Sequence, residues 1–218
     1  MLDLPPPQHY EHVIDSRCGV QQTKQAAYQA LPRLEGWCSE YKASVMIDYV
    51  TLMKPKKIVE IGVFGGSSLI PMAFALQNNG FGKIYGIDPW SVGASIEGMD
   101  PVNANWWSKV DHEKIYQGLL KKIEQYNLNK HIHLLRTTSE ATPPIQNIDI
   151  LHIDGNHSDT ASYHDVNKWI PLVRPGGLII FNDIHCHTTQ RAVQWLDDNC
   201  HRLGSSDDNH GWGVWIRP

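Results

Sequence analysis

The chain has 218 residues, enough to bury one sizeable core but too few to predict two full domains. Its composition, with 41% hydrophobic and 19% charged residues, is typical of an ordinary globular domain and not of a disordered chain. A net charge of −4 argues against the broad basic face with which proteins bind nucleic acids, so we expect no nucleic-acid partner.

The cysteines and the N-terminal residues favour an intracellular location. The four cysteines lie far apart, and no pair has the C-x-x-C spacing of a zinc knuckle or a redox site. The opening "MLDLPPPQHY" lacks the segments of a signal peptide, and no apolar run approaches the roughly 20 residues of a membrane span. We therefore expect a cytoplasmic protein with free thiols and no membrane partner.

The N-terminal quarter predicts helices after an irregular start. The first two dozen residues contain "PPP" and few apolar anchors, which predicts an irregular leader. From about residue 22 to residue 53 apolar side chains recur at helical spacing, so we expect two helices. Pro55 ends the second helix.

Downstream of Pro55, short apolar runs alternate with amphipathic segments. Strands are expected over residues 56–63, 83–88, 132–137, 148–154, 177–183 and 211–218. Helices are expected over residues 68–79, 112–127, 159–173 and 190–201. This alternation predicts one α/β domain with a mostly parallel sheet that helices cover on both faces.

Residues 89–110 break the alternation, because they combine prolines, glycines and tryptophans without clear periodicity. We interpret this segment as a long functional loop or an inserted lid. Trp90 is favoured as a lid side chain that stacks on a ligand, whereas Trp106 and Trp107 either join it or fill the core below.

Glycines and polar residues follow the expected strands at the edge where open parallel sheets bind ligands. "VEIGVFGGSS" (59–68) has glycines at 62, 65 and 66, which free a helix N-terminus to donate hydrogen bonds. Phe64 stands where the second glycine of G-x-G-x-x-G would be, which weakens a dinucleotide-binding interpretation. Asp88 ends the next strand, where an acid can bind both hydroxyls of a ribose. The alternative is a tight turn beside an unrelated surface aspartate.

These stretches resemble a known family. "VEIGVFGGSS" with "IDPW" resembles motif I and the ribose-binding acid of class I S-adenosylmethionine-dependent methyltransferases. "GWCSEYKA", "LHIDGNHS", "DVNKWIPLVRPGG" and "LIIFND" resemble the small-molecule O-methyltransferases, including macrocin-type and family 24 enzymes. The resemblance implies a Rossmann-like α/β fold with a mostly parallel seven-stranded sheet, helices on both faces and an N-terminal helical extension. Residues 1–53 would form a leader and helical cap, and residues 54–218 the S-adenosylmethionine-binding domain.

The resemblance also implies roles for particular residues. The cofactor would be bound by Glu60, Gly62, Gly66, Ser67, Asp88, Trp90, Ser139 and Asp154. A Mg²⁺ ion would be bound by Asp154, Asn182 and Asp183. His157 would be the general base, and Asp154 would act beside it. Some relatives carry two acids where this chain has Asn182-Asp183, so a metal site here would be less negative.

The chemistry of methyl transfer suits these residue types. An alcohol is a poor nucleophile until it loses its proton, which an imidazole can accept and a divalent cation can acidify. The alternative for "IDGNH" is a polar turn whose Asp154 and Asn156 satisfy local backbone donors. His152, inside a strand, is expected to be a hydrogen-bonded core histidine, and the pair His185 and His187 is a poor zinc pattern.

We therefore expect an S-adenosylmethionine-dependent O-methyltransferase that acts on a hydroxyl of a small sugar or phenolic acceptor, assisted by Mg²⁺. The alternatives are a nicotinamide-dependent dehydrogenase on a similar sheet and a cofactor-binding module without catalysis. A homo-oligomer is left open, and the acceptor itself is not encoded in any readable motif.

Overall fold

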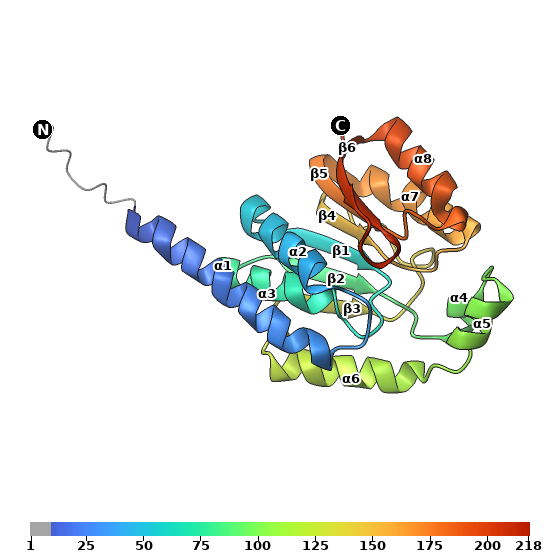
Figure 1. The fold of residues 1–218 in the computed structure, drawn as a ribbon, viewed down its shortest axis with the longest axis horizontal. Helices are drawn as coiled ribbons and strands as arrows, with labels where there is room; N and C mark the ends of the chain where they lie inside the picture. Colours follow the sequence, from blue (N-terminus) through green and yellow to red (C-terminus); the bar gives the residue numbers. More distant parts are fainter. Residues whose placement is uncertain (1–9) are drawn as a thin grey trace, which may run out of the picture.

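A seven-stranded sheet in the order β3-β2-β1-β4-β5-β7-β6 forms the centre of the protein (Figure 1). This computed structural model describes residues 10–218, with side chains from residue 19 onward. The strands are β1 (Lys57–Ile61), β2 (Lys83–Ile87), β3 (Ile132–Leu135), β4 (Ile148–Ile153), β5 (Val173–Asn182), β6 (His201–Ser206) and β7 (Trp212–Ile216). Strands β1 to β5 run parallel, whereas β7 is antiparallel to both β5 and β6.

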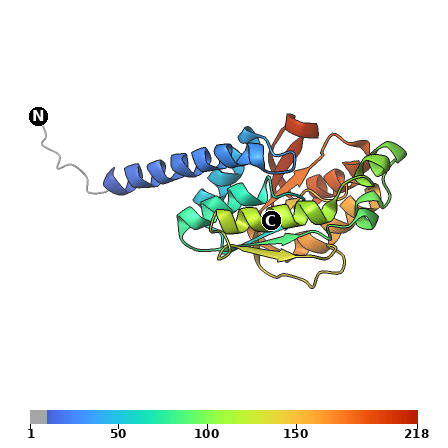
Figure 2. The ribbon, with the colours of Figure 1, turned by 90° about the horizontal axis from the view of Figure 1, so that it is seen from below.

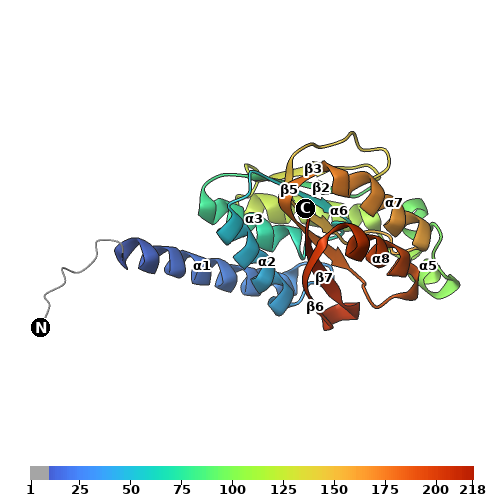
Figure 3. The same cartoon turned by 90° about the horizontal axis from the view of Figure 1, so that it is seen from above.

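Helices cover both faces of this sheet. They are α1 (Tyr10–Ala30), α2 (Glu40–Met53), α3 (Leu69–Asn79), α4 (Val92–Ile96), α5 (Pro101–Trp107), α6 (His112–Gln125), α7 (Asp159–Trp169) and α8 (Gln190–Asn199). Figure 3 shows α2 and α3 separated from α7 and α8 by the strands, and Figure 2 shows α6 on the side of α1 and α3. Every helix that the structure describes is too short or too polar to cross a membrane.

The alternation of side chains along each strand divides the core into two layers. In β1, Ile58 packs with residues of α1, α2, α3 and α6, whereas Val59 and Ile61 pack with residues of α7 and α8. The predicted mostly parallel α/β sheet with helices on both faces is confirmed. The proposed division at residue 53 stays a prediction.

The expectation of an irregular leader is wrong, two helices were missed within residues 89–110, and one strand was not predicted. The interpretation of residues 89–110 as an inserted lid stays a prediction. The irregular leader is helical from Tyr10, and residues 1–9 lie outside the described part. The 89–110 segment contains α4 and α5, since Asp100 caps α5 by accepting from the N–H groups of Val102 and Asn103, and Pro101 fits its first turn. Strand β6 was not predicted, because its exposed residues pair with β7 alone and show no apolar alternation.

Candidate active site

The glycine turn after β1 brings the ends of β1 and β4 together. Gly62 has a φ of +82°, and a Cβ there would lie 2.1 Å from the carbonyl oxygen of Asp154. Gly66 has a φ of +83°, and its Cβ would lie 2.6 Å from Leu119 Cδ1. The positive φ favours glycine at both positions, and at Gly62 the close approach to the Asp154 backbone excludes a side chain as well. Phe64 between them also adopts a left-handed φ of 48°.

Asp88, at the end of β2, fixes this turn. Its Oδ2 accepts hydrogen bonds from the backbone N–H groups of Val63 (3.0 Å) and Phe64 (2.9 Å), and its Oδ1 accepts from that of Trp90 (2.7 Å). Burial raises the pKa of Asp88, although these backbone hydrogen bonds oppose the shift. A carboxylate offers about four acceptor positions, so Asp88 keeps capacity for a further donor such as a ribose hydroxyl.

Trp90 supports the turn from inside the core. Its side chain is only 3% exposed, its Nε1 donates to the carbonyl oxygen of Phe64 (2.8 Å), and its ring lies 4.7 Å from that of Tyr116. The more exposed aromatic side chains beside the turn are Trp37 and Trp106, of which Trp37 stacks on Phe64 at 5.4 Å. Stacking of Trp90 on a ligand stays a prediction.

A polar layer lies where three neighbouring strands end. Glu60 of β1 is paired in register with His152 of β4, and Asn182 ends β5. The Nδ1 of His152 is 3.2 Å from Glu60 Oε1, and its Nε2 is 3.4 Å from Asn182 Oδ1. Ser68 donates a further hydrogen bond to Glu60 Oε1, while Glu60 Oε2 is buried without a partner among the described residues. His152 is therefore a buried, hydrogen-bonded histidine, as expected.

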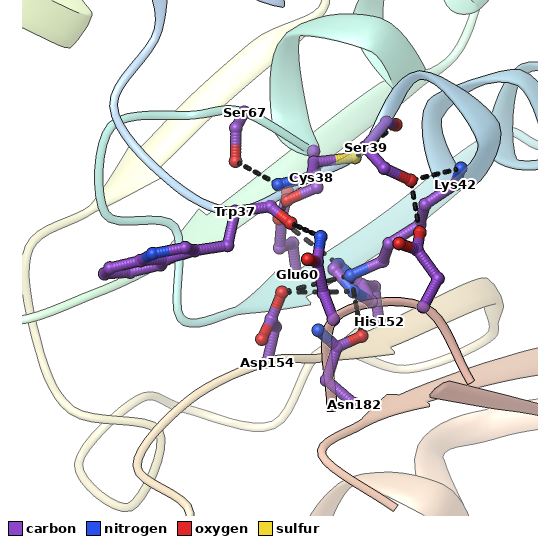
Figure 4. A network of polar contacts seen from close by, with 12 residues as sticks. Trp37, Cys38, Ser39, Lys42, Glu60, Ser67, His152, Asp154 and Asn182 are labelled. Carbon is purple, nitrogen blue, oxygen red and sulfur yellow. Dashed lines mark hydrogen bonds and ion pairs between the residues drawn. The ribbon is translucent and has the colours of Figure 1, made fainter. Parts of the chain in front are cut away.

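Lys42 of α2 points into this layer, and the sequence reasoning missed it (Figure 4). Its Nζ donates to Asn182 Oδ1 (2.6 Å) and to Asp154 Oδ2 (3.2 Å), and the residue is only 1% exposed. Burial works to raise the pKa of Asp154, but the charges of Lys42 and His152 outweigh it and leave that pKa below its ordinary value. Asp154 is therefore held as a carboxylate.

The first turn of α2 is tied to the loop before β7. Ser39 caps α2, because its Oγ accepts from the N–H of Lys42 (3.0 Å), and the same hydroxyl donates to Asp208. The side-chain amide of Asn209 donates to the carbonyl oxygen of Trp37. These contacts, drawn from segments far apart in the sequence, fix where Lys42 enters the site.

Four of the predicted site residues line one small cavity at the ends of β4 and β5. These are Asp154, His157, Asn182 and Asp183. Burial and the charge of Asp154 raise the pKa of Asp183 to about 6, while the charges of His157, His210 and Lys42 oppose the shift. Asp183 also has a φ of 57°, which turns the chain sharply after β5. The convergence expected from the strand ends is therefore present.

The two predicted cofactor serines have protein partners in this structure. Ser67 Oγ accepts from the N–H of Cys38 (3.3 Å). Ser139 donates to Asp165, whose pKa burial raises to about 7 against the opposing hydrogen bond of Ser139 and the charge of Lys168. Their contacts with a cofactor stay predictions.

The predicted Mg²⁺ site does not fit the residues present. Mg²⁺ requires about six oxygen ligands at roughly 2.0–2.1 Å. Two of the proposed ligand residues, Asp154 and Asn182, instead direct an oxygen at the ammonium group of Lys42, which occupies the position between them. Within residues 19–218, no group of three or more His, Cys, Asp or Glu side chains is arranged to hold a metal ion.

The parallel sheet with its β6–β7 hairpin, the glycine turn and the acid after β2 define a class I S-adenosylmethionine-dependent methyltransferase fold. Residues 59–184, more than half of the chain, match the family model described as a methyltransferase domain. The chain therefore belongs to this methyltransferase family, and the resemblance found in the sequence is confirmed.

Two curated relatives, both named as uncharacterized proteins, also match the chain. An uncharacterized protein of Acanthamoeba polyphaga mimivirus is 30% identical over 125 residues, which cover 57% of this chain and 50% of that protein. The chain spans half or less of the length of the curated relatives that it matches.

Solved structures share the fold. The O-methyltransferase NovP superposes with a TM-score of 0.69 at 14% identity, covering 93% of this chain and 99% of that one. The O-methyltransferase TomG of Streptomyces achromogenes, involved in tomaymycin synthesis and solved with S-adenosylmethionine, gives 0.61 at 17% identity, covering 91% and 89%. These likenesses confirm the predicted Rossmann-like methyltransferase fold.

Proposed function

We propose that this chain is an S-adenosylmethionine-dependent O-methyltransferase that methylates a hydroxyl group of a small sugar or phenolic acceptor. The observation that carries the proposal is the cavity shared by Asp154, His157 and Asp183, directly beside the glycine turn. It supplies a base and two carboxyl groups at the sheet edge where such folds bind their ligands.

The residues around the turn suit the cofactor. Gly62 and Gly66 let the chain turn tightly into α3, and Asp88 retains acceptor capacity for a ribose hydroxyl. Ser139 and the buried, partly unpaired Glu60 offer further polar groups around the same edge. When bound, S-adenosylmethionine supplies an electrophilic methyl group.

The protein's own task is then to orient the acceptor and to take its proton. In this proposal His157 is the general base, because its half-buried imidazole lines the cavity beside Asp154 and Asp183. The carboxyl group of Asp183, when ionised, stabilises the imidazolium that forms. Lys42 lowers the pKa of Asp154 and so keeps this neighbouring side chain as a carboxylate. Magnesium is not part of the proposal.

The remaining alternatives are weaker. The family match and the replacement of the second dinucleotide glycine by Phe64 argue against a nicotinamide-dependent dehydrogenase. A module without catalysis would not need an acid and a base lining one cavity, with a buried lysine paired to one of its carboxylates.

Calorimetric titration with S-adenosylhomocysteine tests the cofactor class, and transfer of a labelled methyl group to a panel of sugars and phenols tests the activity. We expect micromolar binding and methylation of at least one hydroxylated acceptor. The His157→Ala variant should keep the binding and lose the methylation. Folded protein that binds no S-adenosylhomocysteine would refute the proposal and revive the dinucleotide alternative.

A further inference from the structure

Lys42 lies where neither helix stability nor burial favours a lysine. Ser39 is the N-cap of α2, so Lys42 is the third residue of its first turn. The positive end of the helix dipole disfavours a cation there, and glutamate is the usual residue at this position of a capping box. The side chain is also almost completely buried, which is costly for an ammonium group without partners.

The partners that offset these costs are the residues that the sequence assigned to a metal. Lys42 Nζ reaches Asn182 Oδ1 at 2.6 Å and Asp154 Oδ2 at 3.2 Å. Asn182 Oδ1 is shared with His152, which links the ammonium group to Glu60. One lysine from an N-terminal helix therefore organises the ends of β1, β4 and β5 (Figure 4).

We propose that Lys42 replaces a divalent cation in this site, so that the enzyme positions Asp154 and Asn182 without a metal. The ammonium group brings a positive charge that is covalently attached to the chain, and it lies between the two oxygens. Lys42 is thus a positioning residue, and activation of the acceptor hydroxyl depends on His157. The claim about turnover rests on the proposed methyltransferase activity, whereas the claim about metal exclusion does not.

The experiment compares the wild type, Lys42→Ala and the control Lys24→Ala. Lys24 is a matched control because its Nζ also pairs with an aspartate, Asp48 of α2, at 2.7 Å, and this pair joins α1 to α2 and contains no residue of the β4 and β5 ends. Binding of Mn²⁺ is measured by electron paramagnetic resonance, binding of S-adenosylhomocysteine by calorimetry, and methyl transfer in EDTA and in Mg²⁺.

The wild type and Lys24→Ala should bind no stoichiometric Mn²⁺ and turn over equally in EDTA and in Mg²⁺. Lys42→Ala should bind S-adenosylhomocysteine within about fivefold of the wild type. In EDTA its turnover should fall on the order of 10- to 100-fold, as expected when a partner that orients reacting groups is lost. It should gain Mn²⁺ binding, and added metal should restore part of its turnover, a response that a merely structural lysine would not produce.

A stoichiometric Mn²⁺ site in the wild type that Asp154→Asn removes would overturn the proposal. So would a Lys42→Ala enzyme as active in EDTA as Lys24→Ala. If Lys42→Ala does not fold, Lys42→Met, which preserves the side-chain volume, takes its place in every measurement. If neither variant folds, the Mn²⁺ measurement on the wild type decides. A wild type that binds neither S-adenosylhomocysteine nor Mn²⁺ would sink the proposed function and leave metal exclusion supported.

Discussion

Replacing Asp183 by asparagine should stabilise the protein at neutral pH. The folded state raises the pKa of this carboxyl group from 3.8 to about 6, first through burial and then through the charge of Asp154. The folded state thus binds a proton more tightly than the unfolded chain does. The stability present at low pH is therefore lost as the pH rises from about 4 through about 6, by about 1.4 kcal/mol per unit.

A shift of about 2 units corresponds to a loss of roughly 3 kcal/mol above pH 7. The substitution Asp183→Asn removes this ionisation and keeps the side-chain size. We expect urea unfolding at pH 8 to report a gain approaching that value, and unfolding at pH 4 to report almost none. The same series on Asp198→Asn, an exposed acid on α8, provides the control.

Two results would refute the reasoning. One is an equal stability change of Asp183→Asn at pH 4 and pH 8, and the other is a loss of stability at pH 8. The variant should at the same time lose methyl transfer, because residues that serve chemistry are often unfavourable for stability. A carboxyl group that costs stability at working pH is therefore further support for a functional role of this cavity.

Two further predictions concern the base and the turn. His157→Ala should lower turnover in steady-state assays on the order of 10²- to 10⁴-fold and keep the affinity for S-adenosylhomocysteine. The control is His187→Ala, at an exposed histidine, which should change neither quantity. A loss of affinity in His157→Ala would contradict the assignment of His157 as the base. Gly62→Ala should destabilise the protein in thermal unfolding by several kcal/mol, since the new Cβ would meet the backbone of Asp154. The control Gly80→Ala should cost only about 1 kcal/mol, because Gly80 also has a positive φ but its surroundings are open. Equal losses at the two glycines would disprove the close approach.

Most of the fold could be predicted because its signals are local. The run into the glycines, the helix that follows and the acid ending the next strand all lie within about thirty residues, from Lys57 to Asp88. Strand β6 escaped prediction because an exposed edge strand needs only its partner β7, and its sequence carries no alternation. Helix α5 was missed although Asp100-Pro101 is a local start signal, since the tryptophans and glycines around it masked the helical spacing.

The site was only half predictable, for a related reason. Parallel strands end at a common edge, so Asp154, His157 and Asp183 could be expected to converge. Lys42 could not, because it is 112 residues away from Asp154 and comes from a helix whose docking depends on the loop before β7. A usable signal did exist: Glu60 and His152 interrupt the apolar runs of two neighbouring strands, and buried polar groups require a partner.

The neutral Asn182 suits a site whose cation is the single positive charge of Lys42. A divalent cation bound by two acids leaves a site without large excess charge. A lysine bound by one acid and one amide does the same. Asn182 offers Lys42 a neutral oxygen. An acid at that position would add a further negative charge beside Asp154, and the one ammonium group of Lys42 could not neutralise both. The asparagine that made the predicted metal site less negative thus becomes intelligible once the cation is a lysine. The two residues form one arrangement, in which the protein itself carries the positive charge at the ends of β4 and β5.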